Sequence, residues 1–250
     1  MIKVNLSLKK LICYSAIPAF LLIYLIVYYL MVLFCSDGVK TSETITKTTD
    51  VPVVIIDPGH GGVDGGAVSA SGILEKDVNL KIAKYINNYC KLSGVECILT
   101  RQEDISLVPK QNMSSSRKRS DLIARAEIAG ENPDSIFISI HQNTFPSSRY
   151  SGLQVFYSKN NGESLKIAEQ IKNSNKEMLD NDNERQLKAA GEEIYILNTI
   201  KSPAVLIECG FLSNAEEASM LATEEYQKEL AFMIYTAIMR YIYLDSGGIV

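Results

Sequence analysis

The sequence predicts an α/β fold, with a twisted, mostly parallel sheet of about six strands flanked by helices in a single domain. Three observations support this class. Strand-like and helix-like segments alternate after residue 51, as is typical of a parallel sheet covered by helices. The runs 53–56, 136–140 and 204–207 are apolar throughout or nearly so, which suits strands buried on both faces. The segment 75–92 carries apolar side chains at helical spacing.

The predicted elements follow in chain order. Strands are expected at residues 52–57, 95–100, 135–140, 152–157, 193–197 and 204–208. Helices are expected at residues 75–92, 117–130, 162–180, 215–221 and 223–243. Segment 152–157 alternates apolar and polar residues, which favours a place at the sheet edge. In the helix 75–92, Glu75 lies on the same face as Val78 and Ile82, so its carboxylate is expected to point with the buried stripe.

The N-terminal region has the features of a membrane anchor. Residues 11–34 carry no charge, and about 20 apolar residues suffice to cross a bilayer as a helix. Three lysines lie within residues 1–10 and the first acidic residue is Asp37, so residues 1–10 are expected to stay in the cytoplasm and the rest to be exported. We expect a transmembrane anchor at 11–35 and a polar, Thr-rich linker at 36–51. A cleaved signal peptide is the alternative, although its apolar core is usually only about 7–15 residues long.

The part of the chain after the anchor is acidic. The whole chain has 25 Lys and Arg against 29 Asp and Glu, and three of the basic residues precede the apolar run, which leaves a net charge of −7. Nucleic-acid binding requires clustered basic residues, so we expect no nucleic-acid partner. The five cysteines show no C-x-x-C spacing and indicate neither a disulfide framework nor a structural zinc site.

The only two histidines each follow one of the apolar runs. His60 comes after the first run and His141 after the second, while Glu208 ends the third. Because the carboxyl ends of parallel strands meet at the edge where α/β folds place ligands, we expect these side chains to lie together. Glu75, at the start of its helix, can reach the same edge as a ligand. The alternative is that Glu75 stands there only because the helix dipole favours an acidic residue at a helix N-terminus. Two imidazoles and a carboxylate form the donor set of a divalent metal site, which favours Zn2+.

Glu208 and Asn143 are candidates for roles beside the metal. A carboxylate at the end of an apolar run is rarely buried unless it is paired or functional, so Glu208 is a candidate general base, the alternative being a strand end that reaches solvent. Asn143 is a candidate for a hydrogen bond to substrate or to a group behind the ligands. A nucleophilic role for Cys209 needs a free histidine, and both histidines are assigned to the metal.

Several segments resemble the zinc-dependent N-acetylmuramoyl-L-alanine amidases, the amidase type 3 family. They are IDPGHGGVDGGA at 56–67, LEKDVNL at 74–80, TRQED at 100–104, SIHQN at 139–143, SGLQVFY at 151–157 and LIECGFLSN at 206–214. These segments follow the family's order over nearly all of residues 53–243. The resemblance implies a catalytic domain at 52–244, zinc ligands at His60, Glu75 and His141, and a catalytic glutamate at Glu208. Asn143 and Arg101 are expected to contact substrate.

The resemblance implies that the amide bond between N-acetylmuramic acid and L-alanine of peptidoglycan is hydrolysed. The apolar N-terminal segment, LEKDV at 74–78 and SRKRSDL at 116–122 are similar to the germination-specific subgroup, which acts on spore-cortex peptidoglycan in muramic δ-lactam formation and germination. That implies a membrane-anchored enzyme outside the cytoplasm, in the cell wall or the forespore intermembrane space. A helper protein or a homo-oligomer is compatible with the sequence. The alternatives are a zinc peptidase acting on stem peptides and a non-catalytic cell-wall-binding regulatory domain.

Overall fold

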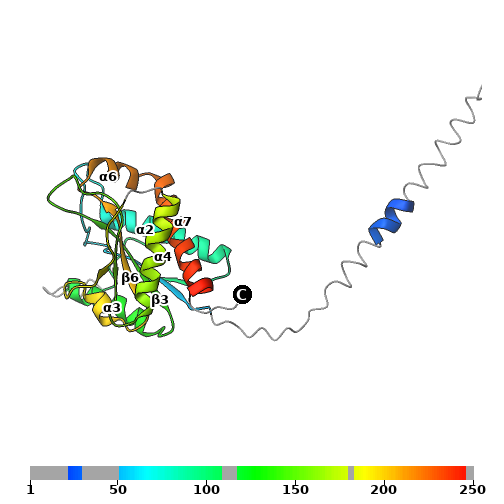
Figure 1. The fold of residues 1–250 in the computed structure, drawn as a ribbon, viewed down its shortest axis with the longest axis horizontal. Coiled ribbons are helices and arrows are strands. Elements are labelled where there is room, and N and C mark those ends of the chain that lie inside the picture. The colour runs from blue at the N-terminus through cyan, green and yellow to red at the C-terminus, as the bar shows by residue number, and fades with distance from the viewer. Residues whose placement is uncertain (1–21, 30–50, 109–116, 180–182, 246–250) are drawn as a thin grey trace, which may run out of the picture. The chain divides into compact units, whose positions relative to one another are not determined.

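The computed structural model describes residues 22–29, 51–108, 117–179 and 183–245 (Figure 1). The chain divides into two units, of which Thr49–Val250 is the larger and Met1–Thr48 the smaller. In the smaller unit, residues 22–29 form a short helix with exposed side chains. Within the described ranges, no helix combines the length and the apolar character needed to cross a membrane. The expected transmembrane helix is therefore not supported, and the rest of the segment 11–35 lies outside the described residues.

The larger unit is built on one six-stranded sheet. Its strands are β1 (Val54–Pro58), β2 (Cys97–Leu99), β3 (Ile136–Asn143), β4 (Gln154–Tyr157), β5 (Lys188–Ala189) and β6 (Ala204–Phe211). Their order across the sheet is β2-β1-β3-β6-β4-β5. All neighbouring pairs are parallel except β4 and β6, which are antiparallel. The mostly parallel α/β sheet that the sequence predicts is confirmed.

Helices cover both faces of this sheet. They are α2 (Glu75–Leu92), α3 (Arg117–Gly130), α4 (Glu163–Met178), α5 (Tyr195–Thr199), α6 (Ala215–Leu221) and α7 (Glu224–Arg240), followed by the π-helical turn η1 (Tyr241–Asp245). Figure 1 shows α2, α4 and α7 on one side of the strands and α3 on the other. Helix α7 packs against both α2 and α4, and the three helices enclose the larger apolar core.

Alternation along the central strands divides the buried side chains between two cores. In β1, Val54 and Ile56 face α2 and α7, whereas Ile55 belongs to the second core, on the side of α5. The three central strands are thus buried on both faces, as their apolar sequences require. The same alternation brings His141 of β3 and Glu208 of β6 to the side of α3 and α5, where both line one cleft.

Two sequence-based assignments are wrong. Residues 193–197 were expected to form a strand, but Tyr195–Thr199 is a short helix, and the outer strand is the two-residue β5. An Ile-Tyr-Ile-Leu run of this length fits either period, and burial of Ile196 and Leu197 in the second core favours the helix. Segment 152–157 was expected at the edge, but β4 lies between β6 and β5. Gln154 and Val155 are buried and Phe156 and Tyr157 are half-buried, so the burial along β4 does not follow the alternation of its sequence.

Candidate metal centre at the sheet edge

The register of the sheet sets the site. In the parallel pair β3 and β6, His141 is the direct partner of Glu208, so the two side chains start from adjacent strands at the same level. Strand β1, on the other side of β3, ends at Pro58, and His60 follows two residues later. The carboxyl ends of all three central strands therefore meet at one edge, as expected for an α/β ligand site.

The turn after β1 places His60. His60 has a φ of +63°, which is uncommon for a residue with a Cβ, and Gly61 and Gly62 follow it with φ of +137° and +60°. Two backbone hydrogen bonds between Gly61 and Asp64, of 2.9 and 3.2 Å, close the turn. Gly59 lies directly against the His141 ring, where a Cβ would overlap the imidazole. The glycine-rich loop thus lets the two imidazoles approach each other.

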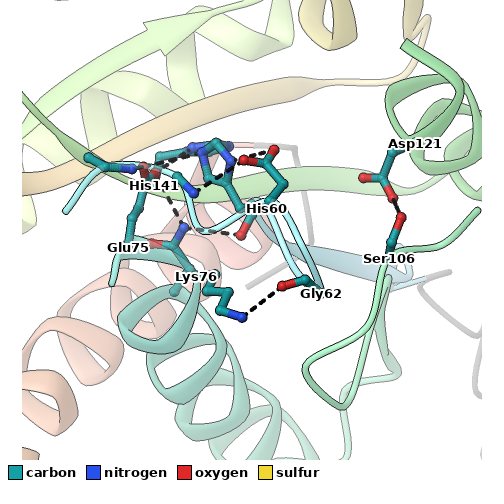
Figure 2. Close-up of polar contacts among 12 residues, drawn as sticks. His60, Gly62, Glu75, Lys76, Ser106, Asp121 and His141 are labelled. Carbon is teal, nitrogen blue, oxygen red and sulfur yellow. Dashed lines mark hydrogen bonds and ion pairs between the residues drawn. The ribbon is translucent and has the colours of Figure 1, made fainter. Parts of the chain in front are cut away.

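Glu75, the first residue of α2, lies between the two histidines. Its Oε1 is 2.8 Å from His141 Nδ1 and its Oε2 is 3.2 Å from His60 Nε2. The two imidazole rings meet edge to face with their centroids 4.9 Å apart. One ligand atom from each of the three residues lies within 4.8 Å of the other two, and Figure 2 shows the three side chains converging. The structure therefore brings together three residues that the sequence singled out, in a group able to hold a metal ion.

Asp64 lies behind His60. Its Oδ2 is 2.9 Å from His60 Nδ1, which leaves Nε2 facing Glu75. Burial alone would lower the pKa of His60, but the hydrogen bonds with Asp64 and Glu75 outweigh it and raise that pKa to about 9. Burial would raise the pKa of Glu75, but the hydrogen bonds of His141 and His60 hold it well below its usual range. Glu75 is therefore a carboxylate at neutral pH, as a metal ligand must be.

Glu208 faces the same cleft from β6. The cleft has a volume of about 220 Å³ and is lined by both imidazoles as well as by side chains of α3 and α5. Glu208 Oε2 is buried and has no hydrogen-bond partner among the described residues. Burial raises the pKa of Glu208 to about 7, and the neighbouring Glu75 charge also raises it. A half-buried carboxyl group with a pKa raised to about 7, beside a cluster of ligands, has the properties of a general base.

Two buried arginines hold the backbone of the His60 loop. Arg125 of α3 donates to the carbonyl oxygens of Pro58 at 3.0 Å and His60 at 2.6 Å. The same guanidinium pairs with the buried carboxylate of Asp57 at 2.5 Å. Arg101 donates to Pro58 O at 2.9 Å and Gly59 O at 3.0 Å, as well as to the carbonyls of residues 76 and 103. The carbonyl groups of Pro58, Gly59 and His60 are thus all fixed by cationic side chains.

The two residues expected to contact substrate lie in different surroundings, and for Arg101 that contact stays a prediction. Arg101 is only 2% exposed, and its guanidinium donates hydrogen bonds to backbone carbonyls beneath the loop. Asn143 ends β3 half-buried on the wall of a second hollow of about 430 Å³, which is also lined by Glu75, by both histidines and by Glu208. Its role in substrate binding stays a prediction. Cys209 is buried, and burial raises the pKa of its thiol, so it has the character of a core residue.

Sequence reasoning missed the polar side chains that support the ligands. They are Asp57, Asp64, Asn79, Arg125 and Ser139, all of which lie next to the ligands or to the loop that carries His60. Asp57 gave a usable signal, because a carboxylate at the end of an apolar run is rarely buried without a partner. The partner itself, Arg125, is 68 residues away in the sequence, and no local pattern points to it.

A parallel α/β domain with a His-Glu-His cluster and a buried carboxylate beside it has the arrangement of a metal-dependent hydrolase. Comparison with known families is more specific. The family described as N-acetylmuramoyl-L-alanine amidase matches residues 54–240, and the chain belongs to this family. The sequence-based expectations of this family and of an amidase are confirmed.

Characterised relatives agree with the assignment. The germination-specific N-acetylmuramoyl-L-alanine amidase of Bacillus subtilis is 38% identical over 190 residues, which cover 76% of this chain and 79% of the relative. The CwlD amidase of Clostridioides difficile, solved in complex with the GerS lipoprotein, is 38% identical with a TM-score of 0.73, over 78% of this chain and 100% of that one. The amidase AmiC2 of Nostoc punctiforme is 33% identical with a TM-score of 0.65, over 76% of this chain and 96% of that one.

Proposed function

We propose that this chain is a zinc-dependent enzyme that hydrolyses the amide bond between N-acetylmuramic acid and L-alanine in peptidoglycan. The observation that carries the proposal is the convergence of His60, Glu75 and His141 at the sheet edge, in a chain whose family is named for this amidase activity. The net negative charge outside the N-terminal segment argues against a nucleic-acid substrate.

The side chains present fit zinc. Two imidazole nitrogens and one carboxylate oxygen form a known catalytic donor set for zinc, which leaves one coordination position open. One ligand atom from each of the three residues lies within 4.8 Å of the other two, and each imidazole lies against a Glu75 oxygen, at 2.8 Å for His141 and 3.2 Å for His60. When bound, zinc supplies Lewis acidity, which activates water and stabilises negative charge on a carbonyl oxygen.

Glu208 supplies the proton transfers. Its carboxyl group lines the cleft that the two histidines share, and its Oε2 is free of hydrogen bonds to the described residues. With a pKa near 7, this group can accept the proton of the attacking water and then deliver it to the departing amine of L-alanine. Oε2 itself is enclosed, while the side chain as a whole is only half-buried and lines the cleft.

The biological setting is inferred from the relatives and the N-terminal sequence. Similarity to a germination-specific amidase supports a role in spore-cortex maturation, through muramic δ-lactam formation, and in germination. The relative solved with a lipoprotein supports a helper protein for this chain also, which co-purification would test. The uncharged run 11–34 after three lysines supports an anchored enzyme outside the cytoplasm. Protease treatment of intact cells tests that location, since an exported domain is digested and a cytoplasmic one is protected.

Product analysis tests the reaction. Peptidoglycan digested by the full-length chain with zinc is analysed by mass spectrometry, alongside Glu208→Gln. The wild type is expected to release stem peptides with a free L-alanine amino group from muramic acid, and the variant to release almost none. Glu217→Gln is the matched control, because burial also raises the pKa of Glu217, and its carboxylate accepts hydrogen bonds from the backbone amides of Gly152 and Phe211.

The outcomes separate the alternatives. Cleavage between residues of the stem peptide would identify a peptidase, and binding without cleavage would identify a regulatory domain. Equal activity of the wild type and Glu208→Gln would exclude the role given to this glutamate.

A further inference from the structure

We propose that Asn79 is a positioning residue that holds the three metal-ligand segments in one arrangement. The inference rests on the proposed metal site, because it concerns how this chain prepares His60, Glu75 and His141 for an ion. Asn79 lies one helical turn after Glu75 in α2, and its side chain is 0% exposed.

The single amide group of Asn79 contacts all three segments. Its Nδ2 donates to the carbonyl of Gly59 at 3.2 Å and to Glu75 Oε1 at 3.4 Å. Its Oδ1 accepts a hydrogen bond of 3.1 Å from Nε2 of Gln142. Gly59 directly precedes His60, and Gln142 directly follows His141. One buried side chain therefore joins the loop after β1, the start of α2 and the end of β3.

The backbone next to His141 also forms a hydrogen bond with the Glu75 carboxylate. The amide of Gln142 donates to Glu75 Oε1 at 3.0 Å, and this oxygen also contacts His141 Nδ1 at 2.8 Å. Asn79 thus helps to select the orientation of the Glu75 carboxylate in which Oε1 faces β3 and Oε2 faces His60. Only a side chain that both donates and accepts can make these contacts, so a leucine of similar size cannot replace it.

The expected consequence is a loss of metal affinity. Hydrogen-bond partners behind metal ligands typically contribute about 10–100-fold to affinity, because they fix the ligands before the ion arrives. Asn79→Leu is therefore expected to weaken zinc binding by about 10–100-fold. Asn175→Leu is the matched control, since Asn175 is also a buried asparagine on a helix, α4, and lies outside both hollows at the metal centre.

The experiment measures the zinc dissociation constant of the full-length wild type and of both variants by competition with a chromophoric chelator. Urea unfolding of the metal-free proteins reports how much general stability each leucine removes. The visible absorption of Co2+-loaded protein reports the ligand geometry, and we expect a changed spectrum for Asn79→Leu alone.

Each outcome decides the matter. Weakened zinc binding and a changed Co2+ spectrum in Asn79→Leu, with both unchanged in Asn175→Leu, support the positioning role. Wild-type affinity in Asn79→Leu, or equal losses in both variants, overturns it while leaving the proposed function intact. A wild-type chain that binds no zinc overturns the proposed metal site together with this inference.

Discussion

Replacing Arg125 with methionine is expected to lower the free energy of unfolding by about 3–5 kcal/mol. Arg125 and Asp57 are 2% and 1% exposed, and their ion pair of 2.5 Å is enclosed by the sheet and α3. Methionine keeps much of the volume of the side chain but removes the cation, which leaves the Asp57 carboxylate buried beside only two hydroxyl donors. Those donors are Thr100 at 2.6 Å and Ser139 at 2.8 Å. An uncompensated buried charge of this kind is among the most destabilising changes in a protein.

The assay is equilibrium unfolding in urea at pH 7 on metal-free protein. Arg240→Met serves as the control, because its partner Glu177 is a half-exposed surface residue and exposed ion pairs contribute only about 0–1 kcal/mol. Adding Asp57→Asn to Arg125→Met should recover part of the loss, since the second change removes the stranded charge.

The pH dependence of the free energy of unfolding tests the same ion pair independently. Burial would raise the pKa of Asp57, but the Arg125 charge and the Thr100 hydroxyl hold it below its ordinary value. In the wild type this carboxylate stabilises the fold above that ordinary pKa of 3.8, and its contribution is lost as pH falls through the folded pKa. Without Arg125 the pKa of Asp57 in the folded chain rises. The difference in free energy of unfolding between the wild type and Arg125→Met should therefore shrink as the pH falls toward 4. A loss below about 1 kcal/mol, or no recovery in the double variant, would show that Arg125 is not needed to neutralise the buried Asp57 charge.

Two further predictions concern the glycine-rich loop and the ionisable groups. Gly66→Ala should abolish most zinc binding, because a Cβ at this position would overlap Glu75 and His60. Gly72→Ala is the control, since Gly72 also has a positive φ but open space around it, and this variant should lose stability only. Chelator competition measures zinc affinity and urea unfolding measures stability, and wild-type zinc affinity in Gly66→Ala would contradict the overlap. Metal-free protein should lose stability as the pH rises from about 5 to 9. Burial raises the pKa of Glu208 from 4.5 to about 7, and for His60 hydrogen bonds outweigh burial and raise the pKa from 6.5 to about 9, so the folded chain retains protons that the unfolded chain has released. Unfolding at pH 5, 7 and 9 checks this, and Glu208→Gln should remove the part between pH 4.5 and 7.

The central strands could be predicted because burial on both faces demands continuous apolar runs. The runs at 53–56, 136–140 and 204–207 correspond to β1, β3 and β6, and the residues that end or follow them come together at one edge. Glu75 could be placed because helical spacing puts it on the buried stripe of α2. These local patterns are enough to predict the fold class and the side chains of the candidate site.

The supporting residues could not be predicted, because their partners are set by tertiary structure. Asn79 shares the buried stripe with Glu75, but nothing local indicates that its amide meets Gly59 and Gln142. Arg125 lies in a helix rich in charged residues, where a solvated side chain is the ordinary expectation. The error at residues 195–199 has a similar cause, since five residues are too few to distinguish the helical period from that of a strand.

The claim on which the account depends is that one metal ion is held by three residues distant in sequence. Anomalous diffraction at the zinc absorption edge, on crystals of the zinc-loaded chain, tests it directly. We expect a single strong peak within bonding distance of His60, Glu75 and His141, with Glu208 nearby but not coordinated. A peak at other residues, or intact diffraction from zinc-loaded crystals with no peak between the two imidazoles, would contradict it.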